Sequence, residues 1–94
     1  MHEYALKLDK YGICYDRYQE LRHFCLQYEK LSERSKLKID EAAIFAAGSY
    51  ANELKKNICY KDMPYRYLNL PYSESQFKRM RRAFFIHLNN SKDE

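Results

Sequence analysis

Residues 73–90 read SESQFKRMRRAFFIHLNN and combine a helix start signal with an apolar stripe at helical spacing. Ser73 and Gln76 stand three positions apart, the spacing of a capping box, in which each side chain bonds to the backbone N–H of the other residue. At 100° per residue, Phe77, Phe84 and Leu88 fall on one side of such a helix. This pattern predicts an amphipathic helix over about residues 74–89.

A half-buried helix is expected earlier, over about residues 17–31. Tyr18, Leu21 and Cys25 recur there at alternating spacings of three and four. Asp16, followed three residues later by a glutamine, has the spacing of a second capping box at its start.

A longer central helix is expected over about residues 36–57. Its alanine-rich strip around residues 42–47 would let a neighbouring helix approach closely, and alanine's helix propensity offsets the cost of Gly48. The apolar line of this helix comprises Leu37, Ile44, Ala47, Ala51, Leu54 and Ile58.

A short helix over about residues 63–68 is expected before the last one. Pro64 suits a first helical turn, where its missing N–H costs nothing, and Asn69 is a natural exit residue. Pro71 then prevents any continuation. Residues 63–89 therefore have the outline of a helix-turn-helix-like unit.

The composition predicts an all-α fold, a compact bundle of about four helices in a single domain (1–94) with a frayed tail at 91–94. The chain has 94 residues, two glycines, two prolines, and neither valine nor threonine. An all-β domain needs β-branched residues and turn glycines in quantity, so that class is excluded.

Cysteine usage and the absence of targeting signals predict a cytoplasmic protein with no membrane contact. Cys14, Cys25 and Cys59 are an odd number and form no CxxC pair, which is typical of free thiols in a reducing compartment. No apolar run approaches 18 residues, and residues 1–10 contain no secretory signal.

The net charge of +4 is concentrated in the second half of the chain. Residues 1–47 are neutral, with eight basic and eight acidic side chains, whereas residues 48–94 carry nine basic and five acidic ones. Such a basic end on a neutral body indicates a polyanionic partner.

The expected last helix places most of these charges on its outer side. Ser75, Lys78, Arg79 and Arg82 fall together, with Arg81 near the margin. We expect Arg79 and Arg82 to read guanine edges in the major groove of double-stranded DNA, and Lys78 or Arg81 to neutralise phosphates. The full set of candidate nucleic-acid-binding residues is Ser75, Lys78, Arg79, Arg81, Arg82, Tyr72 and Lys61.

Residues 68–73 (LNLPYS) resemble the turn of helix-turn-helix units in sigma-factor-like and phage regulators, and residues 73–85 resemble their recognition helix. In size and layout the chain resembles small prophage-encoded helix-turn-helix regulators of Gram-positive bacteria, over about residues 60–89. The resemblance implies a DNA-binding transcription regulator or recombination accessory factor. Such proteins commonly read paired half-sites, so a homodimer formed through the first two helices is expected.

A second hypothesis is inhibition of a host protein or nucleoprotein complex, for example by an anti-CRISPR or other anti-defence protein. The chain has ten tyrosines, four of them between residues 60 and 72, and tyrosine is enriched in interface hot spots. Exposed tyrosines gathered around the arginines would favour a protein partner, whereas arginines projecting alone from a helix would favour DNA.

Enzymatic, metal and cofactor functions are not expected. Asp40, Glu41 and Asp62 have no histidine or serine at a catalytic spacing, and there is no glycine-rich phosphate loop. His23 and Cys25 would point about 200° apart on a helix, so no zinc site is predicted. We therefore expect no catalytic residue, no cofactor and no metal ligand.

Overall fold

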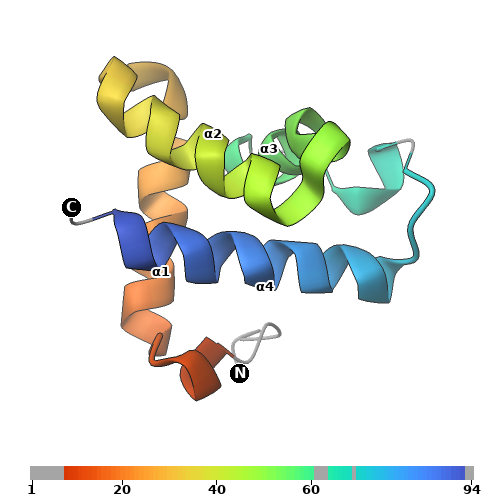
Figure 1. The fold of residues 1–94 in the computed structure, drawn as a ribbon, viewed down its shortest axis with the longest axis horizontal. Helices are drawn as coiled ribbons and strands as arrows, with labels where there is room; N and C mark the ends of the chain where they lie inside the picture. Colours follow the sequence, from red (N-terminus) through yellow and green to blue (C-terminus); the bar gives the residue numbers. More distant parts are fainter. Residues whose placement is uncertain (1–7, 61–63, 69, 93–94) are drawn as a thin grey trace.

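The computed structural model describes residues 8–60, 64–68 and 70–92 (Figure 1). Within these ranges it contains four α-helices and no β-strand: α1 (Tyr15–Leu26), α2 (Glu33–Ala47), α3 (Ala51–Cys59) and α4 (Glu74–Ser91). Short 3₁₀ turns separate or precede them: η1 (Leu8–Tyr11), η2 (Tyr28–Lys30), η3 (Gly48–Tyr50) and η4 (Tyr65–Tyr67). The predicted all-α class is confirmed.

Helices α2 and α4 form the main layer of the fold. They lie side by side and run in opposite directions, while α1 crosses them and α3 packs against α1 and α2 (Figure 1). The ammonium of Lys38 donates to the carbonyl of Lys92 at 2.8 Å, which places the start of α2 beside the end of α4.

Large side chains of α4 and small side chains of α2 fill the core together. The apolar side of α4 is completely or almost completely buried, as the periodicity predicts, and comprises Phe77, Phe84, Phe85 and Leu88. The buried residues of α2 are Ile39, Ala42 and Ala43. From α1, Tyr18 meets the ring of Phe85 edge-on, with 5.1 Å between ring centroids.

The expected central helix over residues 36–57 is interrupted. Gly48 adopts φ 55° and ψ −121°, a conformation that side chains disfavour, and η3 redirects the chain into α3. The predicted apolar line was also wrong at Leu37 and Ile44, which are 55% and 61% exposed. Ala42 and Ala43 of the alanine strip are buried instead, whereas Ala46 and Ala47 are half-buried. Their small side chains leave room for the bulky side chains of α4.

Polar contacts hold the two sides of this bend together. The ammonium of Lys55 on α3 lies 2.7 Å from a carboxylate oxygen of Asp40 on α2, and the hydroxyl of Tyr28 donates to the same oxygen at 2.8 Å. The Lys55 ammonium also lies 4.9 Å from the centroid of the Tyr28 ring. These contacts tie α2, α3 and η2 into one unit.

The start of α1 and the segment before α4 also differ from expectation. Helix α1 begins at Tyr15 with Cys14 as its N-cap, so Asp16 is already helical and does not cap. The short helix expected over residues 63–68 is only the η4 turn, because Pro64 is extended at ψ 161° and lies outside the helical conformation. The expected exit residue, Asn69, lies outside the described residues.

The end of α4 is more ordered than the sequence suggests. Ser91, assigned above to a frayed tail, belongs to the helix, and the Lys92 ammonium lies 5.0 Å from the centroid of the Phe24 ring on α1. The remainder of the expected tail, residues 93–94, lies outside the described residues. In the part of the chain that is described, no helix combines the length and apolarity needed to cross a membrane.

We expect Gly48→Ala to lower the free energy of unfolding by about 1–3 kcal/mol, because a β-carbon strains backbone at this positive φ. An added β-carbon would meet no atom within 4 Å, so the loss measures backbone conformation and not a clash. Urea unfolding followed by circular dichroism measures it, with the adjacent Ser49→Ala as a control that should change by less than about 0.5 kcal/mol. Equal stability of Gly48→Ala and the wild type would contradict this account of the bend.

Candidate nucleic-acid interface

The start of α4 is fixed by the capping box that the sequence predicts. The backbone N–H of Gln76 donates to the Ser73 hydroxyl at 3.2 Å, and the backbone N–H of Ser73 donates to the Gln76 side-chain oxygen at 2.9 Å. Both residues are exposed. The first turn of α4 is therefore ordered at the surface, with two of its orphan backbone groups satisfied.

The outer side of α4 carries most of the predicted contact residues. Ser75, Lys78 and Arg79 are exposed, and Arg82, one turn further, is half-buried. Helical geometry puts these four residues on the side opposite Phe77 and the other buried residues of α4. The structure brings them together as one surface, which we call the outer face of α4.

Arg81 lies apart from the outer face. It is half-buried and lines a cavity of about 290 Å³ together with four α1 residues: Tyr15, Tyr18, Gln19 and Arg22. Burial lowers the pKa of the Arg81 guanidinium, and the nearby charge of Arg22 lowers it further, whereas Tyr18 opposes the shift. The expected marginal position of Arg81 was wrong: at 100° per residue Arg81 lies between Phe77 and Phe85, on the buried side of α4 that faces α1 and away from the outer face.

Tyr72 holds the loop before α4 in place through contacts with two other tyrosines. Its ring meets that of Tyr50 edge-on, with 5.4 Å between centroids, and its carbonyl accepts a hydrogen bond from the hydroxyl of Tyr65. The Tyr65 ring in turn lies 5.1 Å from that of Phe77. Tyr72 is half-buried and positions the N-terminus of α4. Lys61, the remaining predicted contact, lies outside the described residues.

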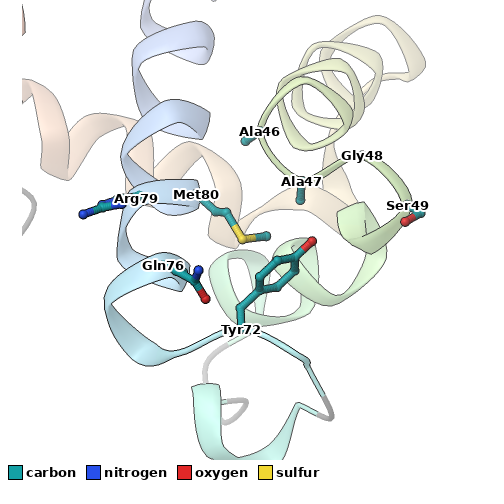
Figure 2. Close-up of a pocket in the computed structure, with 8 residues that line it drawn as sticks. All are labelled: Ala46, Ala47, Gly48, Ser49, Tyr72, Gln76, Arg79 and Met80. Carbon is teal, nitrogen blue, oxygen red and sulfur yellow. The ribbon is translucent and has the colours of Figure 1, made fainter.

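A shallow hollow of about 470 Å³ lies between the end of α2 and the start of α4. It is lined by Ala46, Ala47, Gly48, Ser49, Tyr72, Gln76, Arg79 and Met80. Figure 2 shows Met80 and Gln76 extending toward the ring of Tyr72, while Arg79 extends away from it. The guanidinium of Arg79 therefore projects from the rim of the hollow and does not fill it.

The described tyrosines do not surround the outer face. Tyr60, in the expected tyrosine cluster, is 39% exposed and donates a hydrogen bond to Glu29, which raises the pKa of Tyr60 to about 12. Tyr11 is 51% exposed on η1, and Tyr65 is half-buried. Among the described tyrosines, only Tyr72 lines the same hollow as an arginine of the outer face.

Sequence reasoning missed two clusters that join distant helices. Arg22 comes close to Arg81, and the thiol of Cys25 forms a hydrogen bond with Cys59 that, together with burial, raises the pKa of Cys25. No spacing in the sequence signals either pair, because each depends on how α1 crosses its neighbours. The described residues contain no group of three or more His, Cys, Asp or Glu that could hold a metal ion.

We expect Ser73→Ala to lower the free energy of unfolding by about 1 kcal/mol, because it removes the N-cap acceptor of α4. Ser75→Ala, two residues away on the exposed first turn, is the matched control and should be neutral or slightly stabilising, since alanine favours helix interiors. Denaturant unfolding measures both, and hydrogen exchange at the Gln76 amide reports the cap directly. Equal destabilisation of both variants would contradict a specific capping role.

Comparison with known proteins found no relative of this chain: no family model, no curated protein and no solved structure matches it.

Proposed function

We propose that the protein binds double-stranded DNA by placing α4 in the major groove. The observation that carries the proposal is the outer face of α4, where Lys78 and Arg79 are exposed beside Arg82. Within the described part of α4, the acidic side chain is Glu74, at the N-terminus. A helix that carries cations on its solvent side and a buried apolar stripe on the other fits the groove of a polyanion.

Each residue of the outer face has a chemical role in this proposal. Arg79 and Arg82 donate pairs of hydrogen bonds to guanine O6 and N7, while Lys78 neutralises a backbone phosphate. Ser75 donates to a phosphate or a base edge from the first turn. The N-terminal turn leads into the groove, as recognition helices do in helix-turn-helix proteins.

The packing of α4 against the core also favours DNA binding, because it holds the helix in a fixed position. Phe77, Phe84 and Phe85 are at most 2% exposed, so the helix is held along its length by the core. In the proposed helix-turn-helix-like unit, the single η4 turn takes the place of the first helix. Tyr65 and Tyr72 then fix the loop that leads into α4.

The biological role that fits best is that of a small cytoplasmic regulator or recombination accessory factor from a phage or mobile element. Its support is the resemblance of residues 60–89 to prophage-encoded regulators, together with the basic outer face. Direct readout by Arg79 and Arg82 would give the sequence preference that either role requires.

Binding to a protein is the second candidate function, and one observation favours it. Leu37, Ile44 and Phe45 on α2 are 55%, 61% and 65% exposed, an apolar surface of the kind found at protein interfaces. It lies on α2, so it leaves the outer face of α4 available for DNA. An anti-defence inhibitor or a homodimer would use this surface, and the homodimer is compatible with paired DNA half-sites.

The DNA proposal predicts that Arg79→Ala/Arg82→Ala binds a 25–30 bp duplex more weakly than the wild type. The wild type should bind generic DNA with a Kd of about 10⁻⁴–10⁻⁶ M near physiological salt. Because Arg79 and Arg82 contact bases in this proposal, the slope of log affinity against log salt should change little in the double variant, whereas Lys78→Ala, which removes the phosphate contact, should reduce that slope by about 1. Fluorescence anisotropy at three salt concentrations measures both quantities.

The matched control is Arg34→Ala/Lys56→Ala, which removes the same two positive charges from exposed positions on α2 and α3. It should retain most of the wild-type affinity. Equal weakening in the two double variants would mean that net charge, not α4, governs binding. Absence of binding at about 50 mM salt would overturn the DNA proposal and favour the protein partner.

A further inference from the structure

The cavity between α1 and α4 brings two arginines together, and none of the described residues that line it is a carboxylate. Arg22 reaches it from α1 and Arg81 from α4, and each side chain is half-buried. Within the described residues neither of them forms an ion pair. Two guanidinium groups repel each other, so their juxtaposition costs free energy unless an anion compensates it.

Three other polar residues, all on α1, line the cavity: Tyr15, Tyr18 and Gln19. The Arg22 guanidinium donates to the Gln19 side-chain oxygen at 3.3 Å, which orients the amide. Its central carbon lies 6.0 Å from the centroid of the Tyr18 ring, so Tyr18 also supports Arg22.

The fold satisfies the hydrogen-bonding capacity of Arg81 only in part. Its guanidinium forms a hydrogen bond with Tyr18, whereas its Nε atom has no acceptor within the described part of the chain. Because Nε is covered by protein atoms, an anion in the cavity would meet the terminal nitrogens of the guanidinium. A buried donor without a partner is uncommon in folded proteins and destabilises them. Burial lowers the pKa of this guanidinium, but arginine stays charged in proteins, so the positive charge remains to be neutralised.

We propose that this cavity binds a phosphate group, with Arg22 and Arg81 as its two cationic ligands. Arginines that enter one cavity from two helices approach it from different directions, which suits the several oxygens of a tetrahedral anion, whereas a carboxylate offers only two oxygens in one plane. The volume of about 290 Å³ admits a phosphate group with its linkage atoms.

The phosphate comes either from a DNA backbone or from a small phosphorylated molecule. Lys78, one turn before Arg81 on α4, is exposed and extends the positive charge toward the outer face. A backbone phosphate in the cavity would therefore flank the groove contacts of α4. Only this first source rests on the proposed DNA-binding function.

Titration with inorganic phosphate tests the site without DNA. The probe is the arginine Nε–H spectrum of the full chain by NMR, with sodium chloride of equal ionic strength as the reference. Saturable shifts of the Arg22 and Arg81 signals are expected in phosphate alone. Arg22→Gln should weaken phosphate binding at least about ten-fold, because it removes charge-assisted hydrogen bonds.

The charge-matched control is Arg34→Gln, an exposed position on α2 that does not line the cavity. It should leave phosphate binding unchanged. Because Arg22 is half-buried among polar groups, its replacement should preserve the fold, which the remaining amide spectrum checks directly. Shifts that do not saturate, or equal phosphate affinity in Arg22→Gln and Arg34→Gln, would overturn the proposal.

Duplex titration of the same variants separates the two sources. If DNA supplies the phosphate, Arg22→Gln should weaken duplex binding at every sequence and reduce the salt slope by about 1 relative to Arg34→Gln. If a small molecule supplies it, Arg22→Gln should lose phosphate binding while its duplex affinity equals that of Arg34→Gln. A protein that binds phosphate but no duplex would confirm the cavity and overturn only the DNA function.

Discussion

The packing of bulky α4 side chains against the alanine face of α2 is the contact on which the rest of the structure depends. Phe77 and Phe84 lie in the same core as Ala42 and Ala43, and all four are at most 2% exposed. Burial of each phenylalanine contributes about 1.5–3 kcal/mol to stability. Alanine leaves the room that these rings need, so larger residues on this side of α2 would force α4 away.

This packing determines what the remaining surfaces can do. Because one side of α4 is committed to the core, helical geometry turns Ser75, Lys78 and Arg79 outward. The same rotation places Arg81 between the buried residues Phe77 and Phe85, on the side of α4 where α1 crosses and provides Arg22. The outer face and the arginine-lined cavity are thus two consequences of a single helix orientation.

Local sequence signals predicted the last helix well. The capping box at Ser73 and the stripe of Phe77, Phe84 and Leu88 each depend on residues three or four positions apart, and local geometry determines both. The last helix could therefore be predicted from residues that lie within one or two helical turns of each other.

The central helix was harder to predict because two of its faces compete for burial. Leu37 and Ile44 have the more hydrophobic side chains, but tertiary packing buries the alanine face and leaves them exposed. Hydrophobic periodicity identifies the more apolar face of a helix, but it contains no information about the size of the side chains that pack against it from the neighbouring helix. The break at Gly48 was similarly hidden, since one glycine among alanines costs a helix only about 1 kcal/mol.

The candidate site was predictable only in the part that lies on one helix. Ser75, Lys78, Arg79 and Arg82 share a side of α4 through helical periodicity alone. Arg22 and Arg81 are 59 positions apart in sequence, and their proximity depends on the crossing of α1 and α4. Arg81 was expected near the margin, but its helical angle puts it between the buried residues Phe77 and Phe85, and nothing in the sequence showed that α1 faces it there.

Acidic and basic side chains are distributed unevenly over the surface of the fold. Glu20 pairs with Arg17 at 3.0 Å, Asp40 pairs with Lys55, and Glu29 accepts the hydroxyl of Tyr60, so these acidic groups are engaged on α1, α2 and η2. On α4, Lys78 and Arg79 are exposed, with Glu74 as the acidic neighbour on the same helix. Surface charges act over roughly 8 Å at physiological salt, so a polyanion would be drawn to this side before any specific contact forms. Net charge alone would not orient a partner, whereas the exposed pair of Lys78 and Arg79 on one side of α4 gives the positive charge a defined position.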